Sequence, residues 1–452
     1  MVGDLKLHDA GVLDVPFPDN CVPQAANGAE ETGQATSNRI PADQRLVIAK
    51  DKMTVGGEES GETRRVSGIN GREDLVHQGD GHDGLPGVAK RASDRTGLSG
   101  RFWNGLDVHC RTVGVVDAAP LCDSWVMSQE RSIGPSGILV PPIGVGCWAI
   151  GGQFWADDQP LGWGEVDDRE SLRALRRAFD LGIRLFDTAD VYGTGHSERI
   201  LAQALAGHRD EVIIATKWGN TYDEGRRALL DPDISGSYAR RALEASLRRL
   251  GTDYVDIYQF HLADVGPADA APLLDVLEDM VTAGQIRTYG WSTDDPERAA
   301  SWSAAPHAAV VQHELNVLND APEMLALVER LNWASINRGP LAMGLISDKY
   351  TAHSRLADDD VRGHEPEWMR YFKDGRPAPE WLSRRDAVRE ILVSGGRSPV
   401  QGALAWNLAR SPRTIPIPGC RTVAQVEENA AALEFGPLDP AQLTQIDAIL
   451  GR

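Results

Sequence analysis

The chain has 452 residues, of which 42% are hydrophobic and 25% are charged, a composition typical of a globular protein. Its 66 acidic and 46 basic residues give a formal net charge of −20. This charge argues against a protein whose main task is to bind nucleic acid or an anionic membrane surface. Any anionic ligand must therefore be held by a local, organised site.

The five cysteines are odd in number, widely spaced and form no Cys-x-x-Cys pair, so neither a disulfide framework nor a zinc cage is indicated. The first residues contain no apolar run typical of a signal peptide, and no stretch reaches the ~18 uninterrupted apolar residues of a membrane span. The sequence predicts a cytoplasmic protein without a membrane partner.

The character of the sequence changes near Met127. Residues 1–126 show no sustained helical or strand period, and clusters such as His77-Gln-Gly-Asp-Gly-His-Asp-Gly are typical of loops. We interpret 1–126 as a disordered leader or a start assigned too early, with a folded functional domain as the alternative. Residues 127–452 are predicted to form the folded body.

From residue 138 onward, short β-branched runs alternate with helical segments. Helices are predicted over residues 170–181 and 239–250, each ended by a glycine. A third helix is predicted to begin near Ser197, with the Ser197 hydroxyl as its cap and Glu198 placing negative charge at its positive end. The predicted strands cover residues 143–148, 184–190, 211–217, 255–261, 286–292, 308–315, 333–338 and 413–418.

Eight strands that alternate with helices predict an α/β fold, a (β/α)8 TIM barrel. A doubly wound open sheet is the competing arrangement, but no Gly-x-Gly-x-x-Gly follows the first strand. We expect a hairpin near residues 139–143 to open the barrel and a helix over 439–450 to close it. Residues 348–380 are expected to form a long loop over the active end.

In a TIM barrel the reactive groups lie at the carboxyl ends of different strands. The ends of the second, third and fourth strands carry Asp187 with Tyr192 just beyond it, Lys217, and His261. A phenol has an ordinary pKa of about 10, so a nearby cation is needed to favour the phenolate. Lys217 can supply that charge, Asp187 can hold the ammonium, and His261 can orient a carbonyl group. The set predicts a general acid for carbonyl reduction or a base for alcohol oxidation.

Three motifs in this region resemble those of the aldo-keto reductase family. They are Phe186-Asp-Thr-Ala-Asp-Val-Tyr-Gly-Thr-Gly-His-Ser-Glu, Ala215-Thr-Lys-Trp-Gly and Gln259-Phe-His, and the resemblance spans about residues 131–450. It implies a (β/α)8 barrel whose catalytic tetrad is Asp187, Tyr192, Lys217 and His261.

The resemblance also implies an NADP(H) site that lacks a glycine-rich loop. Gly419 would allow close backbone approach, and Arg421 would bind a 2′-phosphate, unless it pairs with Glu427 or solvent, in which case NAD would be preferred. Ser292 and Gln312 would hold the nicotinamide amide, and the adenosine end would be bound by Gly419, Arg421, Gln425, Glu428 and Asn429. The other implied cofactor-binding residues are Thr293, Arg338, Pro340 and Leu341.

One departure from the family pattern is Arg338, which stands where many members have a tyrosine that stacks on the nicotinamide. Trp148 and Trp218 are expected to line the substrate pocket. His313 and Glu314 lie beside the expected nicotinamide contact, and no metal site is predicted.

The predicted function is NADPH-dependent interconversion of an aldehyde or ketone and an alcohol by hydride transfer, with Tyr192 as general acid and base. One alternative is a dehydrogenase that oxidises a sugar or a pyridoxine-like alcohol, and another is a slowly turning over, NADPH-binding regulatory barrel. The expected partner is a small-molecule carbonyl or alcohol substrate.

Overall fold

The computed structural model describes residues 130–364, 366 and 368–452. The predicted leader, residues 1–126, and its boundary with the folded body lie outside the described residues.

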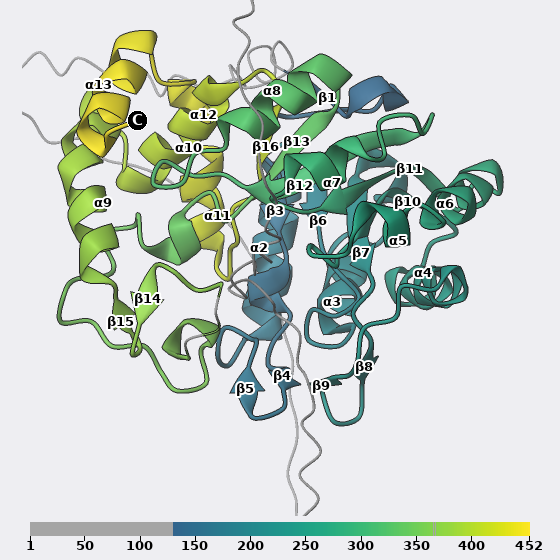
Figure 1. Cartoon of the computed structure of the whole chain (residues 1–452). Helices are drawn as coiled ribbons and strands as arrows, with labels where there is room; N and C mark the ends of the chain where they lie inside the picture. The colour runs from purple at the N-terminus through teal and green to yellow at the C-terminus, as the bar shows by residue number, and fades with distance from the viewer. Residues whose placement is uncertain (1–129, 365, 367) are drawn as a thin grey trace, which may run out of the picture. The chain divides into compact units, whose positions relative to one another are not determined.

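Eight parallel strands form one curled sheet in chain order (Figure 1). All neighbouring strands in this sheet are parallel, as alternating strands and helices require. The strands are β3 (Val145–Gly146), β6 (Leu185–Asp187), β7 (Ile213–Trp218), β10 (Val255–Phe260), β11 (Ile286–Ser292), β12 (Ala308–Glu314), β13 (Ala334–Arg338) and β16 (Thr414–Pro416).

The first and last strands close the sheet into a barrel. The backbone N–H of Gly146 donates to the carbonyl oxygen of Pro418 at 3.1 Å, and a parallel bridge joins Gly146 to Gly419. A Cβ atom at Gly146 would lie 2.7 Å from the carbonyl oxygen of Ile417, so only glycine allows this approach. The predicted TIM barrel is confirmed, and because the two edge strands pair with each other, an open doubly wound sheet is wrong.

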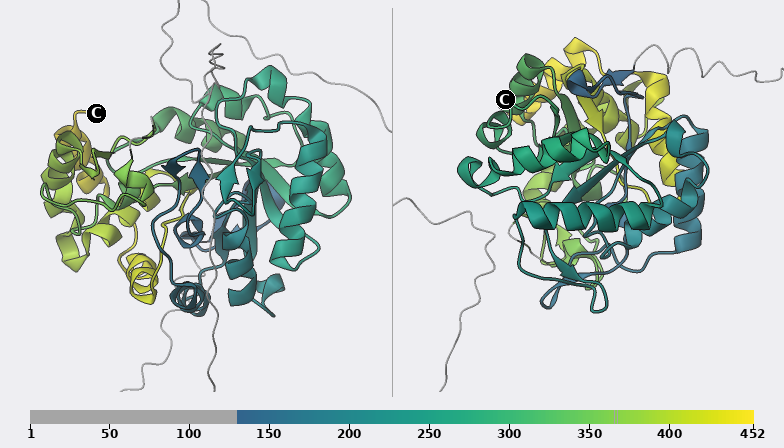
Figure 2. Two further views of the ribbon diagram at one scale, coloured as in Figure 1. Left: turned by 90° about the horizontal axis from the view of Figure 1, so that it is seen from below. Right: turned by 90° about the vertical axis from the view of Figure 1, so that its right-hand side faces the viewer.

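Helices lie outside the strands (Figures 1 and 2). The predicted helices are present, and the one over 236–250 ends at Gly251 with φ +66°. The helices are α2 (Asp168–Asp180), α3 (His196–Ala204), α4 (Gly236–Leu250), α5 (Pro267–Ala270), α6 (Leu273–Thr282), α7 (Pro296–Ala300), α8 (Pro322–Leu331), α9 (Pro379–Leu392), α10 (Pro399–Arg410), α11 (Val423–Ala430), α12 (Ala432–Phe435) and α13 (Pro440–Leu450).

The start of α3 differs from the prediction. Gly195, with φ +90°, is the N-cap, and no side chain caps the helix. Ser197 lies inside the first turn, so its hydroxyl bonds to other elements. The expectation that Ser197 caps this helix is wrong. The chain enters the helix at Gly195 in a left-handed backbone conformation, which only glycine adopts easily.

The barrel has an inner and an outer apolar layer, because side chains alternate along each strand. The inner layer includes Leu185, Ile257 and Ile415, and the hairpin of β1 (Arg131–Ser132) and β2 (Leu139–Val140) closes it with Ile133 and Val140. The predicted opening hairpin is therefore present and begins at residue 131. The outer layer, between strands and helices, holds the large aromatic residues Phe186, Trp218, Tyr258, Phe260, Trp291 and Trp302.

Two hairpins combine into a four-stranded sheet and project at the same end of the molecule in Figure 1.

The predicted long loop over 348–380 contains a further hairpin and several buried side chains, including Tyr350 and Phe372. Its residue Val361 donates a backbone hydrogen bond to Gly162 at 2.8 Å. The strands are β4 (Trp155–Ala156), β5 (Gln159–Pro160), β8 (Tyr222–Asp223), β9 (Ala228–Leu229), β14 (Phe372–Lys373) and β15 (Arg376–Pro377).

No helix within the described part of the chain combines the length and apolar character needed to cross a bilayer.

Candidate active site

The strand register brings the expected catalytic residues to one level of the barrel. Lys217 pairs with Gln259 between β7 and β10, and Asp187 ends the neighbouring strand β6. Ala215 and Ile257 lie in the inner layer, so alternation turns Lys217 and Gln259 inward as well. Lys217 is fully buried and Asp187 is 2% exposed.

The Lys217 ammonium connects Asp187 with Tyr192. It donates to Asp187 Oδ1 at 2.5 Å, to the carbonyl oxygen of Thr188 at 2.8 Å and to the Tyr192 hydroxyl at 3.3 Å. These three partners satisfy all three N–H donors of the buried ammonium. The three side chains, which lie on β6, on β7 and in the loop after β6, therefore meet.

The buried ammonium stays charged. Burial opposes its charged form, but Asp187 and then Tyr192 outweigh this effect and raise the pKa of Lys217. For Tyr192, burial raises the pKa, Lys217 lowers it and Asp187 raises it, and the result lies above the ordinary phenol value. Lys217 acts in the expected direction but does not make the phenol more acidic than usual, because burial dominates.

His261 follows β10 and faces the phenol. Its backbone N–H donates to Trp218 O at 2.8 Å, and its ring lies edge-on to Tyr192 with centroids 5.8 Å apart. Burial, Lys217 and Arg338 hold the pKa of His261 well below its usual range, so the imidazole is neutral. Its Nδ1 is buried without a hydrogen-bond partner among the described residues.

Two glutamines support the second oxygen of Asp187. Oδ2 accepts from Gln259 Nε2 at 3.1 Å and from Gln312 Nε2 at 2.8 Å. Sequence reasoning missed Gln259, although its place two residues before His261 puts it on the inward face. Gln312, expected at the nicotinamide, lies at the level of Asp187 and is bonded to its carboxylate.

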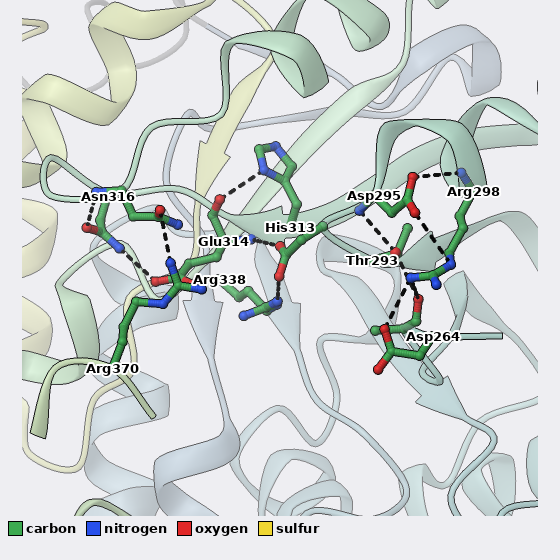
Figure 3. A network of polar contacts seen from close by, with 12 residues as sticks. Asp264, Thr293, Asp295, Arg298, His313, Glu314, Asn316, Arg338 and Arg370 are labelled. Carbon is green, nitrogen blue, oxygen red and sulfur yellow. Dashed lines mark hydrogen bonds and ion pairs between the residues drawn. The ribbon is translucent and has the colours of Figure 1, made fainter. Parts of the chain in front are cut away.

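Ser292 and Thr293 end β11 beside this cluster. Ser292 is in register with Gln312 and 5% exposed. The Thr293 hydroxyl donates to Ala263 O at 3.1 Å, and Arg298 donates to the same carbonyl at 3.0 Å (Figure 3). These bonds join the loop after His261 to the loop after Ser292.

Arg338 ends β13, and its guanidinium pairs with Asp294 (Figure 3). Although burial raises the pKa of Asp294, the charge of Arg338 lowers it below its usual range. Asp294 Oδ1 also accepts the backbone N–H of Glu314 at 2.7 Å. Arg338 is thus fixed at the mouth of the barrel, and the neighbouring Pro340 is buried and Leu341 half-buried.

The expected adenosine end surrounds the start of α11. Gly419 is exposed, and a Cβ atom there would meet nothing closer than 3.8 Å. Arg421 donates to Trp163 O at 2.8 Å and to the carbonyl oxygen of Glu165. It does not pair with Glu427, which binds Arg177 at 2.8 Å.

The other residues expected at the adenosine end lie on or beside α11. The side-chain oxygen of Gln425 accepts a hydrogen bond from the backbone N–H of Arg421 at 2.8 Å. The Gln425 side chain is therefore turned back toward its own loop. Glu428 is half-buried and Asn429 is 5% exposed.

Trp148 and Trp218, both expected at the substrate pocket, lie in different places. The Trp148 ring stacks on Tyr192 with centroids 6.0 Å apart. Trp218 is fully buried in the outer layer against Tyr258 and Phe260, so the pocket position expected for it is wrong. Alternation along β7 explains this, because Lys217 points inward and the next residue must point outward.

His313 also faces the outer layer. Its Nε2 bonds with the Ser335 hydroxyl at 2.7 Å, and its Nδ1 donates to Glu314 O at 3.1 Å. Both ring nitrogens are therefore engaged in a buried hydrogen-bond network.

The closed barrel, the charged lysine in contact with a phenol and the neutral histidine define a (β/α)8-barrel protein with an acid–base site at the carboxyl ends of its strands. Comparison with known proteins agrees with this class. The sequence model described as the Aldo/keto reductase family matches residues 142–451. The chain belongs to the aldo/keto reductase family, and thus to the NAD(P)-dependent oxidoreductases that act on carbonyl and alcohol groups.

Curated relatives include Aldo-keto reductase YhdN of Bacillus subtilis, 32% identical over 66% of this chain and 87% of that protein. L-glyceraldehyde 3-phosphate reductase of Escherichia coli O157:H7 is 30% identical over 71% of this chain and 91% of its own length.

Among solved structures, the glycerol dehydrogenase from Gluconobacter oxydans is 29% identical with a TM-score of 0.60, covering 72% of this chain and 96% of that one. An aldo/keto reductase from Klebsiella pneumoniae in complex with NADP and acetate is 25% identical with a TM-score of 0.52, covering 71% and 95%.

Proposed function

We propose that the protein reduces an aldehyde or ketone to an alcohol with NADPH, with Tyr192 as the general acid. The observation that carries this proposal is the contact of the Tyr192 hydroxyl with the buried Lys217 ammonium, beside the neutral ring of His261. A proton donor, a cation to stabilise its conjugate base and a hydrogen-bonding imidazole are what the reduction of a carbonyl group requires.

The chain's residues fit an NADP(H) cofactor. Ser292 and Gln312 lie in register at the level of Asp187, where a nicotinamide amide would be held. Gly419 is exposed beside the barrel seam, and Arg421 brings a guanidinium to the start of α11. The Klebsiella structure named above was solved with NADP. When bound, NADPH supplies the hydride that the carbonyl carbon accepts.

The protein groups supply the proton. Because the pKa of Tyr192 is raised, its hydroxyl is protonated at neutral pH and can donate to the carbonyl oxygen. The phenolate that this leaves is stabilised by Lys217, which Asp187 holds in place. Neutral His261 can hydrogen-bond the same carbonyl oxygen and orient it.

A cluster of three tryptophans lies beside the phenol. Trp148 stacks on Tyr192. The rings of Trp163 and Trp368 pack against Trp148, with ring centroids 5.3 and 6.0 Å from its own. Trp368 is 40% exposed, which leaves apolar surface at the mouth of the site. We expect the substrate to place a flat or apolar part against these rings.

The likeness to a glycerol dehydrogenase favours one second candidate, oxidation of an alcohol at the same site. The same groups then act in reverse, with the Tyr192 phenolate as the base. Steady-state rates in both directions, measured with NAD(H) and with NADP(H), separate the two candidates.

Replacement of Tyr192 by phenylalanine tests the proposal. The variant keeps the ring that packs on Trp148 and loses only the proton donor, so we expect kcat to fall by about 100- to 10,000-fold. The dissociation constant of NADPH, measured by fluorescence titration, should change by less than about twofold. A variant with unchanged kcat on carbonyl substrates would contradict the assigned role of Tyr192.

A further inference from the structure

A short segment joins the two ends of the proposed acid–base site. It runs from Asp187 at the end of β6 through Tyr192 to the first turn of α3. Loops of this kind are mobile unless other elements hold them. The position of the Tyr192 hydroxyl relative to Lys217 therefore depends on what fixes the segment.

The carboxylate of Glu198 lies at the end of this segment and is fully buried. Its Oε1 accepts from the Thr216 hydroxyl at 2.7 Å, and its Oε2 accepts from Arg249 Nε at 2.6 Å. Thr216 directly precedes Lys217 on β7, and Arg249 lies on α4. One side chain thus joins α3 to the strand that carries the catalytic lysine.

The neighbouring Ser197 adds two bonds to the same segment. Its hydroxyl bonds with the Thr188 hydroxyl at 2.9 Å and donates to Cys147 O at 2.8 Å. The carbonyl oxygen of Thr188 is itself a partner of Lys217. The backbone N–H of Ser197 donates to Tyr192 O at 3.2 Å, which transmits the position of α3 directly to the tyrosine.

Asp190 lies near Arg249 but makes no hydrogen bond to it. It is buried, and neither of its carboxylate oxygens has a hydrogen-bond partner among the described residues. Burial and the charge of Glu198 raise the pKa of Asp190 well above its usual range, which favours its protonated form. Arg249 therefore balances the charge of Glu198 in a buried ion pair.

We propose that Glu198 is a positioning residue, which through Thr216 and Arg249 sets the contact between the Tyr192 hydroxyl and the Lys217 ammonium. This inference rests on the proposed function of Tyr192. Glu198 is buried and would touch neither substrate nor cofactor. It would still affect turnover measurably, because small displacements of reacting groups lower the reaction rate by large factors.

A matched pair of variants at Thr216 tests the proposal. Thr216→Val keeps the shape and removes the hydroxyl, so we expect kcat to fall about 10-fold while KM and the dissociation constant of NADPH change by less than about twofold. Thr216→Ser restores the hydroxyl and should return kcat to within about twofold of the wild-type value. Glu198→Gln removes the ion pair as well and should lower kcat by about 100-fold.

Asp256→Asn serves as the control. Asp256 is also buried and pairs with Arg209 and Arg287, each at 2.8 Å, but it lies near the amino end of β10, away from the site. We expect this variant to lower the melting temperature and leave kcat within about twofold of the wild-type value.

The outcomes separate this inference from the function on which it rests. If Thr216→Val keeps its kcat while Tyr192→Phe loses activity, the positioning role is wrong and the function stands. If Thr216→Ser fails to rescue, or Asp256→Asn lowers kcat equally, the effect reflects general destabilisation and the inference is overturned. If Tyr192→Phe keeps its kcat, the proposed function itself fails. If Glu198→Gln does not fold, the Thr216 pair decides.

Discussion

At the scale of single residues, environment separates groups that share one end of the barrel. Lys217 stays charged because Asp187 accepts a hydrogen bond from its ammonium at 2.5 Å, whereas His261 is neutral because burial and two nearby cations oppose its protonation. Tyr192 stays protonated because its burial outweighs the effect of Lys217. A cation, a neutral imidazole and a protonated phenol side by side suit the reduction of a carbonyl group.

The buried His313 makes stability depend on pH. Burial lowers its pKa from the ordinary value to about 4, so between about pH 4 and 6.5 the unfolded chain binds a proton that the folded chain does not. The free energy of unfolding should therefore fall as the pH drops through this range, by about 1.4 kcal/mol per pH unit from this group.

Urea unfolding of the wild type and of His313→Gln at pH 4.5, 5.5 and 6.5 measures this contribution. The variant loses the bonds to Ser335 and Glu314 and should be less stable at pH 7, with a shallower pH dependence below it. An unchanged slope in the variant would show that other groups cause the pH dependence.

At the scale of elements, close contacts between strands determine where the site residues lie. Gly290 lies on β11, at the place where the register between β11 and β12 shifts. A Cβ atom at Gly290 would lie 2.1 Å from Val310 O. This contact positions Ser292, two residues further along β11.

Gly290→Ala should therefore separate the two strands. We expect the free energy of unfolding to fall by about 1–3 kcal/mol, as in other overpacked cores, when measured by urea denaturation. Gly225→Ala, on an exposed loop where a Cβ atom would meet nothing closer than 3.4 Å, is the matched control and should change stability by less than about 0.5 kcal/mol. Equal effects of the two substitutions would contradict the contact.

A second element-level contact joins α11 to the segment after β5. Arg421 reaches across to the carbonyl oxygens of Trp163 and Glu165, and Trp163 packs on Trp148. The guanidinium has five donors, so these bonds leave others for a phosphate group. The structure therefore permits Arg421 to hold both the segment and the cofactor.

Arg421→Ala distinguishes these two tasks. If Arg421 binds a 2′-phosphate, the KM for NADPH should rise by about 10- to 100-fold and that for NADH should change by less than about threefold. Equal increases for the two cofactors in steady-state assays would show that Arg421 acts only by holding the segment around Trp163.

At the scale of the whole molecule, the described residues bury large hydrophobic clusters among themselves. The seam between β3 and β16 is closed by backbone bonds, the hairpin before β3 covers the amino end of the barrel, and α13 packs against α9 and α10. The interior of the barrel is filled by side chains from its own strands.

A chain that begins at Met127 should consequently fold and turn over substrate. We expect its melting temperature to lie within about 2 °C of that of the full chain, and kcat with NADPH to agree within about twofold. Thermal denaturation and an NADPH absorbance assay on both chains measure this. Loss of folding or of turnover would mean that residues 1–126 contribute to the working enzyme.

The sequence alone predicted the fold of this protein and the side chains of its candidate acid–base site. Apolar runs and helical periods predicted all eight barrel strands, because burial between two layers requires those patterns. The motifs around Asp187, Lys217 and His261 likewise predicted which side chains meet, since the carboxyl ends of parallel strands share one end of a barrel.

Only the tertiary structure decided what those side chains touch. It placed Gln259 on Asp187, Trp218 in the outer layer, Arg421 on two carbonyl groups and Ser197 on Cys147, just beyond β3, instead of on its own helix start. The physical reason is that patterns along the chain specify which face is buried, whereas hydrogen-bond partners between segments distant in sequence depend on strand register and on how loops fold back. The raised pKa of Tyr192 was also decided by the tertiary structure, because burial by distant segments outweighs the charge of Lys217.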